Sequence, residues 1–379
     1  KNISEESIAA HKKLRGKISV VSKDSVSDKD KLSLYYTPGV GAVSSFVAKN
    51  PELARDYTWL NNTVAVISDG SAVLGLGNLG PIGALPVMEG KAMLFKQFAD
   101  IDSIPIVLDV HSADEIVTAV KAIAPSFGAI NLEDIAAPIC FEVEERLKQE
   151  LNIPIMHDDQ HGTAIVVLAG LINAMKVVNK NLDNCKLVVS GVGAAGVAIT
   201  KLLKLYAPSL TIIACDSKGA INSNRDDLNS TKQKLLSDGI ISSDRAGKLS
   251  DAINNADIFV GVSQPNVLAE DMVKSMNSDA VIFALANPNP EIMPDDAKRS
   301  GAAVVATGRS DFPNQVNNAL AFPGIFRGAL DNRVNTITDD HKISAAEVIA
   351  DFVQTPTSDN IIPSIFAEGL SDKIANVIK

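Results

Sequence analysis

The sequence predicts an α/β protein in which strands and helices alternate and the strands pair into mainly parallel sheets. Short apolar runs rich in valine and isoleucine, such as residues 64–67 and 187–190, have the length and composition of buried strands. Segments with helical periodicity lie between them, as expected when each helix returns the chain to the start of a parallel strand. The alternation occurs in both halves of the 379-residue chain, a length that suits two or three domains.

The first half opens with a polar segment, residues 1–35, whose weak periodicity predicts one helix at residues 4–14 followed by an irregular arm. Strands and helices alternate from residue 63 onward. We expect strands at residues 64–67, 104–110 and 129–132, and helices at residues 86–99, 113–124 and 141–151.

The second half repeats this pattern after a long apolar helix at residues 163–178. The expected strands are residues 187–190, 210–214, 258–262, 280–285 and 303–306, with a helix at residues 194–206 after the first of them. Two further helices are predicted in the tail, at residues 344–353 and 361–378.

The composition argues against several classes of function. Asp and Glu number 45 against 35 Lys and Arg, and a net charge of −10 repels a nucleic-acid backbone or an anionic membrane surface. No apolar stretch reaches the roughly 18 residues of a membrane span, and no signal peptide is visible. Three scattered cysteines, Cys140, Cys185 and Cys215, predict buried thiols in a reducing compartment. We therefore expect a cytoplasmic protein that acts on small molecules.

A glycine pattern in the second half predicts a dinucleotide site. Gly191, Gly193 and Gly196 follow an apolar strand and open an apolar helix. The first glycine permits a tight turn, the second lets the backbone approach a pyrophosphate, and the third allows the helix to pack closely on the strand. The helix N-terminus, with Ala194 and Ala195 in its first turn, adds positive potential. These features predict a Rossmann-type doubly wound sheet; the alternative is a glycine-rich turn of an unrelated α/β protein.

An acidic residue follows the next predicted strand, because Asp216 lies 20 residues after Gly196. A carboxylate there accepts hydrogen bonds from the adenosine ribose and repels a 2′-phosphate, which favours NAD over NADP. Lys218, two residues further on, would weaken that discrimination. The alternative is that Asp216 is a solvated residue at the end of a strand.

Two acidic pairs follow apolar runs in the first half, where side chains reach the ligand-binding edge of an α/β sheet. The pairs are Glu133-Asp134 and Asp158-Asp159. Carboxylate oxygens are the ligands that Mg²⁺ and Mn²⁺ prefer, although Asp134 and Asp159 could equally cap helices. His157 and His161 flank the second pair without the glutamate of a zinc-protease motif, so we expect them to be surface or capping residues.

Several segments together resemble the malic enzyme family, and its short bacterial form in particular. They occur in order from about residue 10 to beyond residue 330, so the resemblance is far more specific than any single motif. The segments are YYTPGV at 35–40, SDGSAVLGLGNLG at 68–80, LPVMEGKA at 85–92, NLEDI at 131–135, HDDQHGT at 157–163, the glycine pattern, ANPNP at 286–290 and FPG at 322–324.

The resemblance implies a reaction and a role for each matching position. The reaction is the oxidative decarboxylation of malate to pyruvate and carbon dioxide, with reduction of NAD and a divalent Mg²⁺ or Mn²⁺. Tyr36 matches the general acid and Lys91 the general base. The resemblance further implies that Glu133, Asp134 and Asp159 bind the metal, that Asp158 lies beside the lysine, that Asn287 and Asn318 hold malate, and that Asn287 also contacts the cofactor. Ala72 stands where larger animal-type enzymes carry a malate-binding arginine, which short bacterial forms also lack.

These residue types suit that chemistry. A metal on the C2 oxygen of malate lowers the pKa of the hydroxyl and then polarises the keto group. Lysine can act as a base only if its pKa falls well below about 10.4, which burial and a nearby metal would bring about. We expect Lys91 and Tyr36 to titrate as a coupled pair. Without the resemblance, Lys91 would be interpreted as a surface lysine and Tyr36 as a packed aromatic residue.

The family's architecture implies a domain organisation and an assembly. We expect a malate- and metal-binding catalytic domain at residues 1–160, an NAD-binding domain at 161–340, and a C-terminal helical segment at 341–379 that packs back on the first domain. The site then lies in the cleft between domains. The polar arm resembles a segment that crosses to a partner subunit, so we expect a homodimer with Tyr36 near or across its interface.

Two other functions fit part of the pattern. A metal-independent NAD-dependent dehydrogenase of another small substrate would share the two-domain layout without needing the carboxylates. A non-enzymatic dinucleotide-sensing module would need the glycine pattern alone. Loss of activity with a chelator distinguishes the first alternative, and NADH production from malate distinguishes the second.

Overall fold

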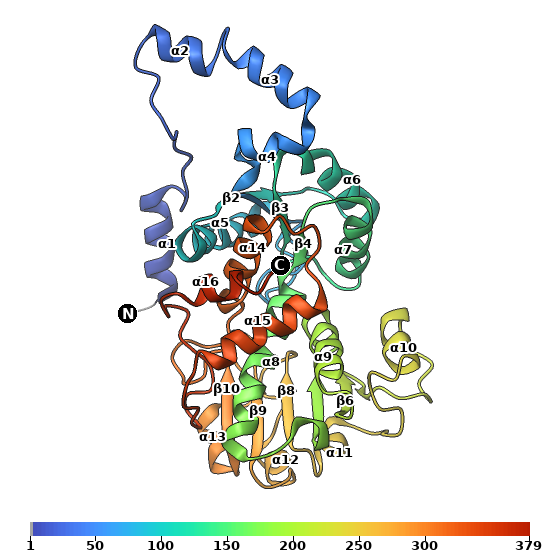
Figure 1. Ribbon diagram of the computed structural model, residues 1–379. Helices are drawn as coiled ribbons and strands as arrows, with labels where there is room; N and C mark the ends of the chain where they lie inside the picture. Colours follow the sequence, from blue (N-terminus) through green and yellow to red (C-terminus); the bar gives the residue numbers. More distant parts are fainter. Residues whose placement is uncertain (1–2) are drawn as a thin grey trace.

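The computed structural model describes residues 3–379 and confirms an α/β protein with two separate, mainly parallel sheets (Figure 1). The first sheet has the strand order β2-β1-β3-β4, and its neighbouring strands are parallel. Its strands are β1 (Thr63–Ser68), β2 (Asp102–Val107), β3 (Ala129–Leu132) and β4 (Ile155–His157). All four carboxyl ends lie at one edge, so the loops that follow the strands meet there.

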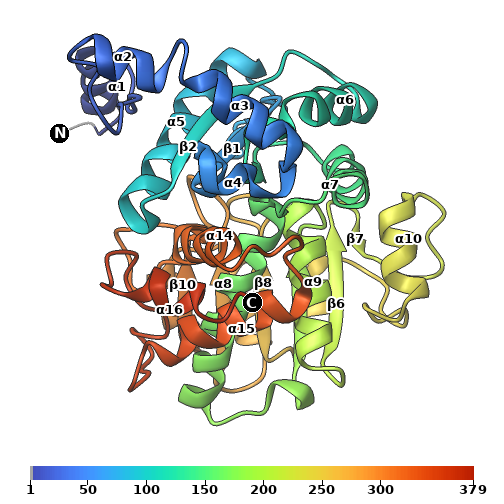
Figure 2. The ribbon, with the colours of Figure 1, turned by 45° about the horizontal axis from the view of Figure 1, so that its top comes forward.

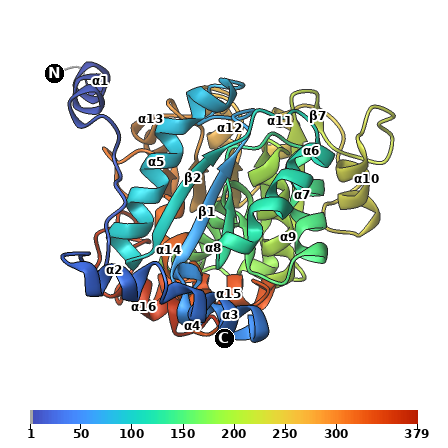
Figure 3. The ribbon, with the colours of Figure 1, turned by 90° about the horizontal axis from the view of Figure 1, so that it is seen from above.

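Helices cover both faces of the first sheet, as expected for parallel strands buried on both sides. Figure 3 shows α5 on one side of β1 and β2, and α6 and α7 on the other. These helices are α5 (Gly80–Ala99), α6 (Ala113–Ile123) and α7 (Ile139–Glu150). Val64 and Val66 of β1 belong to the core that includes α5. Ala65 and Ile67, which point to the opposite face, belong to the core that includes α6 and α7.

The second sheet has the strand order β10-β9-β8-β5-β6-β7. Its strands are β5 (Lys186–Ser190), β6 (Thr211–Asp216), β7 (Gly219–Ala220), β8 (Ile258–Gly261), β9 (Ala280–Ala284) and β10 (Ala302–Thr307). The chain enters at β5, adds β6 on one side and β8 to β10 on the other, and all these strands are parallel; the short β7 pairs antiparallel with β6. This order confirms the doubly wound, Rossmann-type sheet and creates a switch point between β5 and β8, where such proteins bind ligands.

Two cores form on the two faces of the second sheet. Val188 of β5 packs with α11, α12 and α13, whereas its neighbours Leu187 and Val189 pack with α8, α9 and α15. The helices are α8 (Asp158–Val178), α9 (Ala194–Tyr206), α10 (Ser230–Ser237), α11 (Leu249–Ile253), α12 (Glu270–Lys274), α13 (Pro294–Arg299) and α15 (Asp339–Asp351). Cys140, Cys185 and Cys215 are all buried, as predicted.

Helix α8 connects the two sheets, because it follows β4 of the first and leads to β5 of the second. Of the described residues, α8 alone is long and apolar enough to cross a membrane by length and composition. About two thirds of its most apolar window (67%) is buried inside the protein, as in the core helix of a folded domain.

Two predicted helices begin earlier than expected. The helix predicted at residues 86–99 starts at Gly80, with Pro81 in its first turn and Pro86 inside it. Proline favours the first turn of a helix, and here Pro81 occupies that position. The helix predicted at residues 163–178 starts at Asp158, since the polar residues before Thr163 form its first turn.

The C-terminal helices lie against both halves of the chain. Figure 2 shows α14 (Phe322–Asp331), α15 and α16 (Leu370–Ala375) gathered in front of α8. Helix α15 packs on α8, and α16 packs on α14 and α5. The helix predicted at residues 361–378 is wrong for its first half, because the described helix begins at Leu370, directly after Gly369 in the left-handed region with a φ of +79°.

The N-terminal region has helices but no core of its own. They are α1 (Ile3–Leu14), α2 (Lys29–Tyr35), α3 (Val40–Lys49) and α4 (Ala54–Tyr57), and none of the four contains a buried residue. Figure 1 shows α2 and α3 projecting from the body at the end of an extended segment. The sequence predicted an irregular arm after α1, so α2 corrects that prediction.

Candidate active site

Three of the four predicted carboxylates come together where β3 and β4 end. Glu133 and Asp134 follow β3 directly, and Asp159 lies in the first turn of α8 after β4. Because β3 and β4 are parallel neighbours, their carboxyl ends bring these side chains to one point. Ligand oxygens of Glu133, Asp134 and Asp159 all lie within 4.8 Å of one another.

The backbone around Asp134 is held in a conformation that faces the cluster. Asp134 has a φ of +54°, in the left-handed region, and its N–H donates to Oδ2 of Asp159 at 2.7 Å. Its carbonyl oxygen accepts from the N–H of Ala72 at 3.0 Å. The glycine-rich loop at residues 69–80 therefore fixes the orientation of a metal-ligand candidate.

The cluster carries more negative charge than its surroundings neutralise. Burial, together with the charges of Asp159 and Glu133, raises the pKa of Asp134 to about 8. Burial also raises the pKa of Asp159 to about 6, and that of Glu133 is raised for the same reason. Oδ2 of Asp134 is buried and has no hydrogen-bond partner among the residues described. A divalent cation would relieve both the repulsion and the unpaired oxygen, and an all-carboxylate set suits Mg²⁺ or Mn²⁺.

Lys91 lies beside this cluster and is buried, with 7% of its side chain exposed. Its Nζ is 3.0 Å from Oε1 of Glu133 and forms a second, shorter ion pair with Asp158. The ammonium also lies 4.0 Å from the ring centroid of Phe322, at the start of α14. Lys91 is therefore not a helix-surface lysine, and it faces the same point as the three carboxylates.

Burial alone does not lower the pKa of Lys91; the expectation combined burial with the charge of a nearby metal. Burial acts in that direction, but the charges of Asp158 and Glu133 outweigh it and hold the pKa above its ordinary value. Burial raises the pKa of Asp158 itself to about 6, against the attraction of Lys91. Positive charge added beside these carboxylates would lower the pKa of Lys91 again.

The two histidines are not surface residues, which corrects the prediction. His157 is fully buried, and His161 is mostly buried with its Nε2 2.8 Å from Oε2 of Glu144. Glu144 also accepts the backbone N–H of His157 at 3.0 Å, so it fixes the junction of β4 and α8. Sequence analysis missed Glu144, although its position one residue after Val143 and three before Leu147 places it on the buried face of α7.

The glycine turn has the predicted geometry. Gly191 has a φ of +104°, and a Cβ there would lie 2.5 Å from the carbonyl oxygen of Val262. A Cβ on Gly196 would lie 1.9 Å from the carbonyl oxygen of Gly191, so any side chain would push α9 away from β5. A Cβ on Gly193 would meet nothing within 4 Å, which leaves space for a cofactor next to the N-terminus of α9.

A buried glutamate fixes the loops opposite this turn. Glu291 is fully buried and accepts the backbone N–H groups of Ser263 at 2.9 Å and Ala286 at 3.0 Å. These residues belong to the loops that follow β8 and β9, at the carboxyl edge of the sheet. Sequence analysis missed Glu291, because a single glutamate in a polar proline-rich segment has no pattern that indicates burial.

Asp216 lies at the end of β6, as predicted, but its carboxylate is already paired. Arg225 and Lys232 both bond to it, and these ion pairs outweigh partial burial to lower its pKa to about 2. The alternative that Asp216 is a solvated residue is therefore wrong, and no pattern in the sequence indicated either partner.

The two predicted asparagines lie where the halves of the chain meet. Asn287 follows β9, and its carbonyl oxygen would lie 3.4 Å from a Cβ on Gly75 in the glycine-rich loop of the first half. Asn318 begins a short 3-10 helix, Asn318–Leu320, beside Gly162 in the first turn of α8. Both therefore approach the edge at which the carboxylates gather.

Tyr36 is the one predicted catalytic residue that the fold leaves apart from the others. It caps the C-terminus of α2 on the projecting segment, and 67% of it is exposed (Figure 1). Lys91, by contrast, is buried in the body of the protein.

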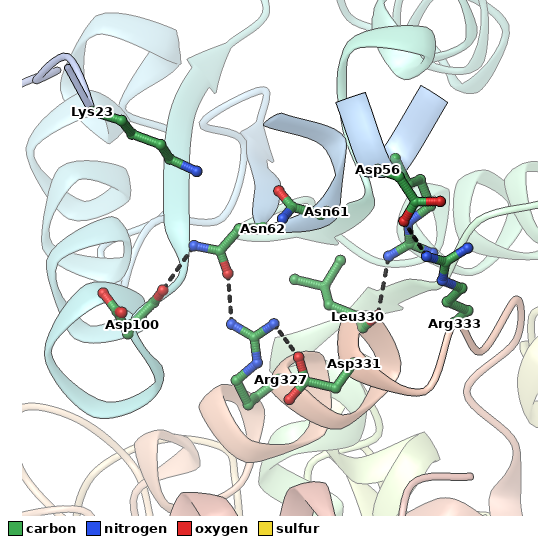
Figure 4. A pocket seen from close by; sticks show the side chains of 10 residues that line it. Lys23, Asp56, Asn61, Asn62, Asp100, Arg327, Leu330, Asp331 and Arg333 are labelled. Carbon is green, nitrogen blue, oxygen red and sulfur yellow. Dashed lines mark hydrogen bonds and ion pairs between the residues drawn. The ribbon is translucent and has the colours of Figure 1, made fainter. Parts of the chain in front are cut away.

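A cavity of about 390 Å³ lies elsewhere, between the N-terminal segment and the end of α14 (Figure 4). Arg55 donates to the carbonyl oxygen of Leu330 at 3.2 Å, and Arg327 donates to Asn62 at 2.6 Å. No predicted site residue is among the residues that line this cavity. The hydrogen bonds of Arg55 and Arg327 join the N-terminal segment to α14.

The fold and the site together define a class of protein. A doubly wound sheet with a glycine-rich dinucleotide turn faces a carboxylate cluster and a buried lysine, the arrangement of a dinucleotide-dependent oxidoreductase. Residues 15–148 match the family model "Malic enzyme, N-terminal domain", and residues 160–378 match "Malic enzyme, NAD binding domain". The chain belongs to the malic enzyme family, as its motifs indicated, and it is an enzyme with an NAD-binding domain.

Known relatives are similar over the whole chain. The "Bifunctional malic/malolactic enzyme" of Bacillus subtilis is 51% identical over 100% of this chain and 92% of the relative. The "NAD-dependent malic enzyme" of Geobacillus stearothermophilus is 50% identical over 100% of this chain and 78% of the relative. The crystal structure of the NAD-dependent malic enzyme of Thermotoga maritima has a TM-score of 0.95 and 48% identity, covering 98% of each chain.

Proposed function

We propose that this chain catalyses the oxidative decarboxylation of malate to pyruvate and carbon dioxide with NAD, at a divalent cation held by Glu133, Asp134 and Asp159. Membership of the malic enzyme family and the NAD-binding domain support the reaction. The observation that carries the proposed site is the convergence of three carboxylates within 4.8 Å of one another, with Nζ of Lys91 3.0 Å from one of them. A bound Mg²⁺ or Mn²⁺ would supply a Lewis acid for the C2 oxygen of malate.

Lys91 is the proposed general base for the C2 hydroxyl. A base at this point removes the hydroxyl proton as the hydride leaves C2 for the nicotinamide ring. In the described arrangement Asp158 and Glu133 favour the charged form of Lys91. Neutralising Glu133 by ligation would remove one of these charges and lower the pKa of Lys91, which prepares the amine to accept a proton.

Tyr36 is the proposed general acid, and we infer that it acts from the partner subunit. After carbon dioxide leaves C3, the resulting enol must be protonated at carbon, and a tyrosine hydroxyl can donate that proton. Tyr36 lies on a projecting segment with no buried residue. A homodimer in which this segment reaches the partner's cleft would complete both sites and cover its exposed apolar side chains.

We assign the amide contacts to malate and the pyrophosphate site of the cofactor to residues of the second half of the chain. Asn287 and Asn318 are the proposed amide donors to the carboxylates of malate, and Asn287 also borders the cofactor site. The turn from Gly191 to Gly196, including Ala194 and Ala195, is the proposed pyrophosphate site. We accordingly propose a catalytic domain at 1–160, an NAD-binding domain at 161–340 and a C-terminal segment at 341–379, which is supported by the packing of α16 on α5.

The test is an assay of NADH formation from malate, with and without Mn²⁺. We expect turnover that disappears with a chelator and returns when Mn²⁺ is restored. Turnover that a chelator leaves unchanged would favour the metal-independent dehydrogenase. NAD binding without turnover of malate would favour the sensing module. The cytoplasmic location remains a prediction from composition.

A further inference from the structure

Glu144 is a buried carboxylate that holds three groups close to the proposed metal site. It lies on the inner face of α7, and 8% of its side chain is exposed. Its Oε1 accepts the backbone N–H of His157 at 3.0 Å and lies 2.8 Å from Nζ of Lys148. Its Oε2 lies 2.8 Å from Nε2 of His161. An ionised carboxyl group only accepts hydrogen bonds, so Nε2 of His161 is the donor.

Glu144 stays ionised although it is buried. Burial raises the pKa of this carboxyl group, but His161 and Lys148 outweigh burial and hold the pKa well below its ordinary range. Hydrogen bonds to an ionised acceptor are roughly twice as strong as those between neutral groups. Glu144 is therefore a stronger anchor for the two histidines than a neutral side chain of the same size would be.

The two histidines enclose the residues that carry the proposed chemistry. His157 ends β4 and caps the N-terminus of α8, and His161 follows one turn later in α8. Asp158 and Asp159 lie between them in the chain. Glu144 therefore holds the start of α8 on both sides of these two carboxylates.

The ring of His157 depends on its backbone for its position. It is fully buried, and neither of its nitrogens has a hydrogen-bond partner among the residues described. Its Nε2 lies 3.8 Å from Oδ2 of Asp159, so the ring packs beside the proposed metal ligand. Because the backbone N–H of His157 is held by Glu144, a shift of that contact would reach Asp159 through the ring as well as through the helix.

The first turn of α8 is also closely packed against the rest of the site. A Cβ on Gly162 would lie 1.9 Å from Oδ1 of Asp158 and 3.0 Å from Cβ of Asn318. A rotation of this turn would therefore move Asp158 relative to Asn318, which is proposed to bind malate. Interiors packed this closely transmit small displacements instead of absorbing them.

We propose that Glu144 is a positioning residue of the proposed metal site. By holding His157 and His161, it fixes the first turn of α8. That turn carries Asp158, which pairs with the proposed base, and Asp159, a proposed metal ligand. The inference rests on the proposed function, because it gives Glu144 a role only if Asp159 binds the metal. Removing a group that orients metal ligands typically lowers metal affinity or activity by about 10- to 100-fold.

The test is calorimetric titration of Mn²⁺ into the parent, Glu144→Gln and Glu142→Gln, without malate or turnover. Glu142 is the matched control, because it lies on the same helix, is 58% exposed and pairs with Arg146. We expect Glu144→Gln to raise the Kd for Mn²⁺ by about tenfold or more and to change the Kd for NAD far less. Glu142→Gln should change neither. A smaller rise for Mn²⁺ in Glu144→Gln, or an equal loss of NAD affinity, would overturn the proposal.

A pair of variants at His161 gives a second test that does not depend on the folding of Glu144→Gln. His161→Gln keeps an amide donor that can bond to Glu144, whereas His161→Leu leaves an oxygen of Glu144 without its donor. We expect His161→Leu to bind Mn²⁺ more weakly than His161→Gln does, by about threefold or more. Equal Mn²⁺ affinities in the two variants would show that the ring of His161 only fills space, and would overturn the proposal.

The titration of the parent separates this inference from the proposed function. A parent that does not bind Mn²⁺ would overturn both the proposed metal site and the role of Glu144. A parent that binds Mn²⁺, with Glu144→Gln binding it equally tightly, would overturn the positioning role alone.

Discussion

At the scale of single residues, Lys91 has the most distinctive environment at the proposed site. It is buried, it pairs with Asp158 and Glu133, and its ammonium lies over the ring of Phe322. Burial disfavours the charged form of the side chain, but the ion pairs with Asp158 and Glu133 outweigh it and raise the pKa of Lys91. Any positive charge added at the carboxylates changes that balance, which is how metal binding and proton transfer would be linked.

Replacing Lys91 tests its role as a base. We expect Lys91→Ala to lower kcat by about 100- to 10,000-fold, the usual contribution of a general base, while the Kd for NAD stays nearly unchanged. Lys96→Ala is the control, because Lys96 lies on the same helix but pairs with exposed Asp100. Steady-state kinetics and NAD fluorescence titration measure the two effects. Turnover near the parent value in Lys91→Ala would remove Lys91 from the mechanism.

Replacing Asp159 tests the metal site separately from the cofactor site. We expect Asp159→Ala to weaken Mn²⁺ binding by roughly tenfold or more, because an acidic ligand is lost, and to leave NAD affinity unchanged. Mn²⁺ is titrated against each variant by calorimetry. Asp271→Ala is the matched control, since Asp271 is 94% exposed and pairs with Lys274. Superimposable Mn²⁺ titrations for parent and Asp159→Ala would show that Asp159 does not bind the ion.

At the scale of elements, the connection between β5 and α9 has two glycines that do different things. A Cβ on Gly196 would collide with the carbonyl oxygen of Gly191, whereas a Cβ on Gly193 would meet only open space. The third glycine of the pattern, Gly196, therefore allows α9 to pack closely on β5. The second glycine, Gly193, leaves space for a ligand that approaches the N-terminus of α9.

Alanine at these two positions should separate stability from binding. We expect Gly196→Ala to lower the free energy of unfolding by about 1–3 kcal/mol or more, through overpacking of a buried turn. Gly193→Ala should leave the Tm near that of the parent, because its φ of −88° suits alanine, but weaken NAD binding. Thermal unfolding and NAD titration of both variants give the comparison. Equal losses of Tm would contradict the division of roles.

At the scale of the whole molecule, the N-terminal region lacks a core within one chain. Helices α1 to α4 have no buried residue, and their exposed apolar side chains include Ile8, Leu34, Tyr35, Tyr36 and Phe46. Exposed apolar side chains without a core of their own are typical of a protein–protein interface. A second copy of the chain would cover it and would bring Tyr36 to a site that otherwise lacks its acid.

Mixing two inactive variants tests whether Tyr36 acts across a dimer interface. We expect Tyr36→Phe and Lys91→Ala to be nearly inactive alone and to recover about a quarter of the parent activity after co-refolding or co-expression. Random mixing makes about half of the dimers hybrid, and in each hybrid one site carries both changes while the other carries neither. No recovery, in mixtures shown by mass spectrometry to contain hybrid dimers, would place Tyr36 and Lys91 in the same subunit. A monomeric mass at micromolar concentration would exclude the dimer itself.

Local patterns in the sequence determined the elements and the dinucleotide turn of this protein. The strand at residues 129–132 and the helix at residues 194–206 have the predicted boundaries, and Gly191 and Gly196 have the conformation and close contacts that their positions implied. This succeeded because hydrophobic periodicity and the steric demands of a tight turn act over a few neighbouring residues.

The tertiary structure alone decided which charges meet and which side chains are buried. Lys91 and Asp158 are 67 residues apart in the chain and become partners only because α5 and the end of β4 reach the same edge of a sheet. His157 and His161 are buried because β4 and α8 pass through the interior, and Asp216 is paired because α10 folds back to it. Burial and charge contacts depend on the distance between elements in space, which residue spacing along the chain does not specify.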